Sequence, residues 1–151
     1  MDEQSQEVVK YLGRGVRLSN NNLMDVNGLF DVMLEILETP LELTWVDLSF
    51  NNIASLSGLS ALPENLTVLY LHANNITSLN EVAVLLRFTE LRTLTLYGNP
   101  IEDIKNYRFC ILSMFPKLKT FDKVTVTDRD KQTAEAYRAF FWPKAVKNKT
   151  K

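Results

Sequence analysis

One eleven-residue phrase occurs three times in this chain and constrains its fold more than any other feature. The copies are LTWVDLSFNNI at 43–53, LTVLYLHANNI at 66–76 and LRTLTLYGNPI at 91–101. Each copy has the pattern LxxLxLxxNxL, in which other aliphatic residues replace leucine at some positions. The asparagines Asn51, Asn74 and Asn99 are 23 and 25 residues apart. Such spacing indicates stacked units of nearly constant length.

This pattern and spacing are typical of leucine-rich repeats, whose units contain about 20 to 29 residues. Residues of the LxL part alternate across a short strand, so Val46 and Leu48 and their equivalents point into the core. At the asparagine the chain turns away, and the side-chain amide can satisfy backbone groups that the turn leaves unpaired. We therefore predict an α/β fold: a right-handed solenoid with a short parallel β-sheet on its concave face, helices and 3₁₀ turns on its convex face, and a helical C-terminal cap.

The flanking sequences extend the repeats into a single predicted domain over 1–151. Residues 1–28 form an N-terminal segment with a degenerate first repeat, VRLSNNNL at 16–23, and residues 29–117 contain the other repeats. The C-terminal cap occupies 118–142, and 143–151 is a basic tail. In the cap, Leu118 and Phe121 fill the inward positions of a half repeat. Thr127 and Asp130 match a capping box that begins a final helix.

Helical spacing predicts the elements on the convex face. A helix is expected over 29–38, and its apolar residues share one side: Leu29, Met33, Ile36 and Leu37. The connection 51–66 is expected to be turn or 3₁₀ helix, because it is short and contains glycine and proline. Residues 81–87 can form about two helical turns, and 102–115 a longer helix.

Composition limits the classes of function. A net charge of −1 over 151 residues gives no broad field of one sign, so direct binding of nucleic acid or of a membrane surface is not expected. No apolar run approaches the roughly 20 residues of a membrane-spanning helix, and the first residues lack the features of a secretory signal. The single cysteine, Cys110, excludes an internal disulfide. We expect a cytoplasmic protein that is a monomer within a larger assembly.

The sequence predicts no catalytic site, no cofactor and no metal site. His72 is the only histidine, so neither a histidine metal site nor a histidine-based triad can be completed. Cys110 lies in an apolar stretch, where a packing thiol is expected rather than a nucleophile. We therefore expect a non-enzymatic protein whose function is to bind other proteins.

A protein partner is expected on the concave sheet, because the outward residues of the strands form rows there. Large amphipathic rings anchor interfaces, which favours Trp45, Tyr70 and Tyr97. The alternative for Trp45 and Phe50 is packing against a neighbouring coil. The predicted partner-binding residues are Arg17, Trp45, Asp47, Phe50, Tyr70, His72, Thr95, Tyr97 and Asp122.

The C-terminal end offers a second predicted contact. One helical face cannot bury Phe140, Phe141 and Trp142 together, so at least one of them is expected to be exposed or covered by a partner. The alternative is that this segment folds back over the open end of the stack. Lys144 and Lys147 belong to a tail that could contact an acidic surface such as tubulin, or could simply be solvated.

Several of these motifs resemble the SDS22-like class of leucine-rich repeats with its C-terminal cap. The motifs that carry the resemblance are NPI at 99–101 before a helix, FPKL at 115–118, FD at 121–122 and the closing helix after Thr127. The residues outside the repeat frame, Trp45, Phe50, Tyr70 and His72, favour a subgroup within that class. That resemblance implies a non-enzymatic protein of ciliated cells, in the axoneme of a cilium or flagellum. Two other functions stay open: a soluble regulatory subunit of an enzyme such as a phosphatase, and an RNA-particle component of the U2 A-prime type.

Overall fold

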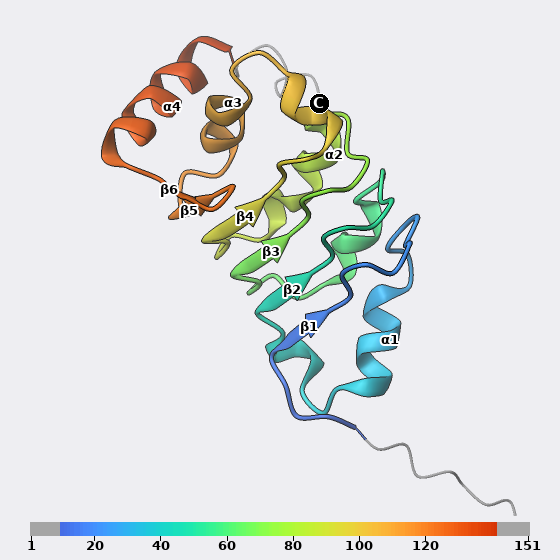
Figure 1. Cartoon of the computed structure of the whole chain (residues 1–151). Coiled ribbons are helices and arrows are strands. Elements are labelled where there is room, and N and C mark those ends of the chain that lie inside the picture. Colours follow the sequence, from blue (N-terminus) through green and yellow to red (C-terminus); the bar gives the residue numbers. More distant parts are fainter. Residues whose placement is uncertain (1–9, 142–151) are drawn as a thin grey trace, which may run out of the picture.

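The computed structural model describes residues 10–141, which form a curved solenoid with one continuous sheet (Figure 1). The strands follow one another across the sheet in chain order. They are β1 (Gly15–Arg17), β2 (Trp45–Asp47), β3 (Val68–Tyr70), β4 (Thr93–Thr95), β5 (Thr120–Phe121) and β6 (Val124–Thr125). Strands β1 to β5 pair in parallel, whereas β5 and β6 form an antiparallel hairpin. The predicted α/β leucine-rich repeat solenoid is confirmed.

The convex face carries short helices of mixed type. The α-helices are α1 (Leu29–Ile36), α2 (Leu79–Val82), α3 (Tyr107–Met114) and α4 (Asp128–Phe141). The 3₁₀ helices are Pro40–Glu42, Ser57–Ala61, Ala83–Arg87 and Pro100–Asp103. The connection expected to be turn or 3₁₀ therefore has that form, and the two turns expected over 81–87 begin earlier, at α2, and continue as 3₁₀ helix.

Two details of the expected helices were wrong. The helix expected over 102–115 begins only at Tyr107, because Asn106 adopts a left-handed conformation with φ 59° and the residues before it belong to a 3₁₀ turn. Ile36 was placed on the buried side of α1, but its side chain is exposed. Leu37, just beyond the helix, is buried in its place.

The core lies between the sheet and the convex helices, and the ladder of asparagines closes it at one edge. Asn74 shows the pattern: its Oδ1 accepts from Ile53 N at 3.0 Å, and its Nδ2 donates to Leu48 O at 2.9 Å and to Leu71 O at 3.0 Å. Asn51 and Asn99 bond to the neighbouring coils in the same way. Each amide thus joins two coils and satisfies backbone groups that no strand pairs.

Just before the ladder, every coil turns through a left-handed residue. These residues are Asn20, Phe50, Ala73 and Gly98, with φ between 54° and 72°. In the last coil, Asp122 and Lys123 both have positive φ and form the tight turn between β5 and β6. This conformation suits glycine and asparagine and is rare for a bulky residue, so Phe50 is the exceptional member of the column.

The C-terminal end of the stack is closed by the hairpin and by α4, which packs on α3 (Figure 1). The predicted capping box is present: Asp130 N donates to Thr127 Oγ1 at 3.1 Å, and Thr127 N donates to Asp130 Oδ2 at 2.9 Å. Leu118 and Phe121 are buried, as the half repeat predicts. Arg108 of α3 ties these parts together through an ion pair with Asp130 at 3.2 Å.

Candidate protein-binding surface

The strand register brings the predicted rows together on the concave face. Arg17, Asp47, Tyr70 and Thr95 lie directly beside one another in β1 to β4. A second row is formed by Trp45, Val68, Thr93 and Thr120. The inward positions of the same strands are buried, and so are Asp47 and Thr95 of the first row, so a partner can reach only the other members of the two rows.

Aromatic rings form a connected group across the middle of this face. Trp45 and Tyr70 meet edge to face with their centroids 5.9 Å apart. His72 contacts Phe50 edge to face at 5.2 Å and stacks on Tyr97 at 4.6 Å with an interplanar angle of 10°. The group therefore holds its own geometry before any partner arrives, which reduces the entropy lost on binding.

A hollow of about 390 Å³ lies in this face, and we call it the concave hollow. Residues from β1 to the β5–β6 turn line it, among them Arg17, Asp47, Phe50, Tyr70, His72 and Lys123. A space of this size can receive one or two side chains of a partner. It contains most of the residues that the sequence predicts for the concave site.

Asp47 is a positioning residue of the hollow rather than a contact surface. Its side chain is 3% exposed; Oδ2 accepts from Arg17 Nε at 3.1 Å and Oδ1 accepts from Ser49 Oγ at 2.6 Å. Burial by itself would raise the pKa of Asp47, but the hydrogen bonds from Ser49 and the Arg17 guanidinium outweigh it and lower the pKa. The carboxylate is therefore charged at neutral pH and holds Arg17 over β2.

His72 is held from below by Thr95. The side chain of Thr95 is fully buried; its Oγ1 lies 2.8 Å from His72 Nδ1 and accepts from Leu71 N at 3.2 Å. Burial and the nearby Lys123 lower the pKa of His72, against a smaller opposing effect of the aspartates. The imidazole is therefore neutral at physiological pH, which suits stacking on Tyr97.

Asp122 directly follows β5 and accepts hydrogen bonds from the preceding coil and from α3. Its Oδ1 accepts from Leu96 N at 2.7 Å and Tyr97 N at 3.1 Å, and its Oδ2 accepts from Tyr107 Oη at 2.8 Å. Burial raises the pKa of Asp122, although the three hydrogen bonds oppose this effect. Burial and the Asp122 carboxylate also raise the pKa of Tyr107. Both oxygens of Asp122 thus bond within the fold.

Lys123 was not predicted as a site residue, yet it lines the hollow. Its Nζ lies 5.3 Å from the centroid of the Tyr97 ring, and the residue is exposed. The basic residue after Asp122 is visible in the sequence, but only the tight β5–β6 turn directs it back over β4. The hollow therefore has a cation at each end, Arg17 and Lys123.

The structure places the nine predicted concave residues at different depths. Exposed or partly exposed are Arg17, Trp45, Phe50, Tyr70, Tyr97 and Asp122. Asp47, His72 and Thr95 are buried. Trp45 also packs on the neighbouring coil. Its ring lies so close to Gly15 that a Cβ added there would be 2.8 Å from the ring. Direct contact with a partner stays a prediction for the six exposed or partly exposed residues. Thr95 is fully buried and cannot contact a partner.

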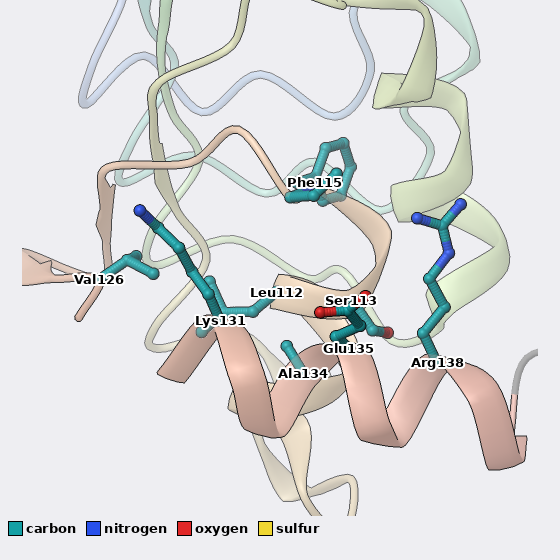
Figure 2. A pocket seen from close by; sticks show the side chains of 9 residues that line it. Leu112, Ser113, Phe115, Val126, Lys131, Ala134, Glu135 and Arg138 are labelled. Carbon is teal, nitrogen blue, oxygen red and sulfur yellow. The ribbon is translucent and has the colours of Figure 1, made fainter. Parts of the chain in front are cut away.

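The second predicted contact is only partly visible. Phe140 of α4 is 79% exposed, Phe141 is the last residue of that helix, and Trp142, Lys144 and Lys147 lie outside the described residues. A separate hollow of about 270 Å³ lies between α3 and α4. Figure 2 shows its apolar floor, formed by Leu112, Phe115, Val126 and Ala134, and a charged rim of Lys131, Glu135 and Arg138.

Cys110 and the remaining acidic groups give no sign of a chemical site. Cys110 is buried, and its Sγ lies 3.2 Å from the hydroxyl of Tyr137, in a packing role. Over residues 10–141 there is no group of three or more histidine, cysteine, aspartate or glutamate side chains arranged to hold a metal ion. No helix within the same range is long and apolar enough to cross a membrane.

Comparison with known proteins agrees with this architecture. The sequence model of the family described as leucine-rich repeat matches residues 15–149. The chain belongs to the leucine-rich repeat family. Leucine-rich repeat-containing protein 51 of Rattus norvegicus is 41% identical over 141 residues, which cover 93% of this chain and 73% of the relative. The human protein of that name is 42% identical over 129 residues, 85% of this chain and 67% of the relative.

Other similar proteins include a ribonucleoprotein component and two solved leucine-rich repeat structures. U2 small nuclear ribonucleoprotein A′ of Neurospora crassa is 38% identical over 91 residues, 58% of this chain and 35% of the relative. Among solved structures, a chain of the Drosophila melanogaster SNF/U2A′ complex has a TM-score of 0.71 with 27% identity, covering 89% of this chain and 74% of that one. The Mex67 leucine-rich repeat domain of Chaetomium thermophilum has a TM-score of 0.63 with 23% identity, covering 79% and 87%, and shows the shared fold.

Proposed function

We propose that this leucine-rich repeat protein is a non-enzymatic scaffold that binds a partner protein through its concave face, as a component of the axoneme of cilia or flagella. The leucine-rich repeat is an interaction module whose stacked units build a curved surface for a partner. The observation that carries the proposal is the connected aromatic group. Tyr70, His72 and Tyr97 form its centre.

Most of these rings lie outside the hydrophobic core. The hydrophobic core is complete without Tyr70, Tyr97 and Phe50, which all lie outside the buried cluster. Aromatic side chains that remain accessible and are already fixed by their neighbours are the kind of residue that dominates interface energetics. The concave face is therefore better explained by binding than by stability.

The axonemal setting rests on the likeness to leucine-rich repeat-containing protein 51, as the relatives in rat, cattle and human are named, together with the resemblance of Trp45, Phe50, Tyr70 and His72 to that subgroup. On a microtubule-associated assembly, a small repeat protein can act as an adaptor that holds a partner protein. Within it we expect one copy of this chain per binding site.

The test is retention on the axoneme. The full chain is tagged in a flagellated cell, and membranes and soluble proteins are removed with detergent. We expect the tagged chain to stay on the axoneme and the Tyr70→Ala/Tyr97→Ala variant to be released. A matched variant, Leu12→Ala and Leu41→Ala, removes two exposed apolar side chains away from the concave hollow and should stay bound. Complete release of the unmodified chain would exclude the axonemal role.

The likeness to U2A′ favours one alternative, a subunit of an RNA particle. In that case the partner would again be a protein on the concave face, since only two cations, Arg17 and Lys123, border the hollow. Such a small basic surface is weak for direct RNA binding. Purification of the tagged chain with small nuclear RNA, rather than with tubulin, would support this alternative.

A further inference from the structure

Phe50 places a bulky side chain at a turn that is left-handed in every coil. Its φ is 54° and its side chain is 54% exposed. At the equivalent turns the other coils use smaller residues, Asn20, Ala73 and Gly98. A bulky residue in a strained conformation, with its ring largely in solvent, is a mark of functional sites.

The exposed charges of the concave hollow are both positive. The side chain of Arg17 is 72% exposed, and Lys123 is exposed above the Tyr97 ring. The acidic groups nearby are occupied: Asp47 is buried under Arg17 and Ser49, and Asp122 accepts three hydrogen bonds from within the fold. The charged groups that a partner can reach in the hollow are thus both cations, while the two carboxylates that balance them, Asp47 and Asp122, already accept hydrogen bonds within the fold.

The two cations are separated by a distance that suits a helix. Their backbones are four strand intervals apart in the sheet, at β1 and after β5. Arg17 reaches toward β2 and Lys123 reaches back over Tyr97, next to β4. The charges are therefore about two strand intervals, roughly 10 Å, apart. Seven residues of an α-helix span about the same length and make nearly two turns, so side chains seven positions apart lie on the same side of the helix.

We propose that the partner segment is an amphipathic helix with two acidic residues, seven or eight positions apart, which pair with Arg17 and Lys123. Apolar side chains between the two acids occupy the hollow against Phe50, Tyr70 and His72. This inference rests on the proposed function and adds the chemistry of the partner. The ring of Phe50 lines the hollow and forms one wall of the site.

The experiment is a selection from an unbiased library of displayed peptides of roughly 16 residues, long enough to cross the hollow as a helix. The full chain and its Tyr70→Ala/Tyr97→Ala variant are used in parallel, and the sequences enriched only on the full chain are read. We expect pairs of Asp or Glu seven or eight positions apart, with apolar residues between them. A synthetic peptide of this kind should bind about tenfold more weakly after both acids become Gln, or to the Arg17→Gln/Lys123→Gln chain.

The outcomes separate the two proposals. Neutral or basic peptides that depend on Tyr70 and Tyr97 would overturn the acidic helix and leave the concave-face function intact. Peptides enriched equally on the double alanine variant, or no enrichment on either chain, would count against both. A single-stranded oligouridine that binds through Arg17 and Lys123 more tightly than any selected acidic peptide would overturn the proposal in favour of RNA.

Phe50 gives an independent test. The Phe50→Asn variant relieves the left-handed strain, so its thermal midpoint should be at least that of the parent chain, while it binds the selected peptide about tenfold more weakly. Leu41→Asn removes a similarly exposed apolar side chain outside the hollow and should leave binding unchanged. Unchanged binding by Phe50→Asn would show that the ring is not part of the site.

Discussion

Neighbouring residues of one strand show how differently the two faces of the sheet are constrained. Leu69 and Tyr70 are adjacent in β3, yet Leu69 is fully buried whereas Tyr70 is only partly covered by Trp45 and His72. The same contrast holds in β2 between Val46 and Trp45. Side chains on the inward side are fixed by core packing, and those on the outward side by neighbouring rings. We therefore expect different residues of the same strand to determine stability and binding.

The first and largest effect expected from this contrast is at the inward side. Leu69→Ala removes a fully buried side chain and should lower the free energy of unfolding by about 2 to 5 kcal/mol. Chemical denaturation of the full chain measures this loss. Leu86→Ala, at a partly exposed residue of the convex face, is the control and should lose less. Equal losses of unfolding free energy in the two variants would show that the inward side of the sheet is no more important for stability than an exposed position.

The ladder asparagines should show the next largest effect. Asn74→Ala leaves Ile53 N, Leu48 O and Leu71 O without the partner that they have now. Leu48 O and Leu71 O keep a second donor, the amides of Asn51 and Asn99, but Ile53 N is left unsatisfied, and an unsatisfied buried donor destabilises a fold by about 1 to 3 kcal/mol. The adjacent Asn75 is exposed, and Asn75→Ala should change the stability by less than about 0.5 kcal/mol in the same denaturation experiment. A ladder that tolerates Asn74→Ala would mean that water replaces the amide.

On the outward side the effect on stability should be smaller. Tyr70→Ala removes a half-buried ring and its edge contact with Trp45, worth about 0.5 to 1.5 kcal/mol beyond the area that it buries. The thermal midpoint should fall less than in Asn74→Ala. A fall as large as that of Leu69→Ala would mean that Tyr70 belongs to the core, and the division between the two faces would be wrong.

The smallest expected effect is an electrostatic one in the cap. Hydrogen bonds from Arg108 and from Thr127 lower the pKa of Asp130 to about 2, against about 3.9 in the unfolded chain. Its contribution to stability is therefore present above pH 4 and is lost as the pH falls toward 2. The difference in thermal midpoint between the parent chain and Asp130→Asn should shrink over that range. A difference independent of pH would show that the ion pair contributes nothing.

The repeat phrase predicts much of this architecture because its period is local. The spacing of the leucines gives the strands, their inward positions and the rows of the concave face, and the capping box at Thr127 and Asp130 gives the start of α4. These features depend on residues a few positions apart, so one coil suffices to recognise them.

Other features depend on contacts between coils and could not be predicted in this way. Asp47 and Thr95 occupy outward positions, but hydrogen bonds to Arg17 and His72 hold them below the surface. Asp122 is held by hydrogen bonds from Leu96 and Tyr97 of the preceding coil. The direction of Lys123 depends on a turn with two left-handed residues. None of these partners is adjacent in sequence.

The central claim is that the outward face of the sheet is the partner site, and photo-crosslinking in the cell tests it most directly. A photoreactive phenylalanine analogue is placed at Tyr70 in the full chain, and at Val32, an exposed residue of α1 on the convex face, in a second chain. Our account predicts a specific crosslinked protein from position 70 and none from position 32. A partner captured from position 32 and not from position 70 would contradict it.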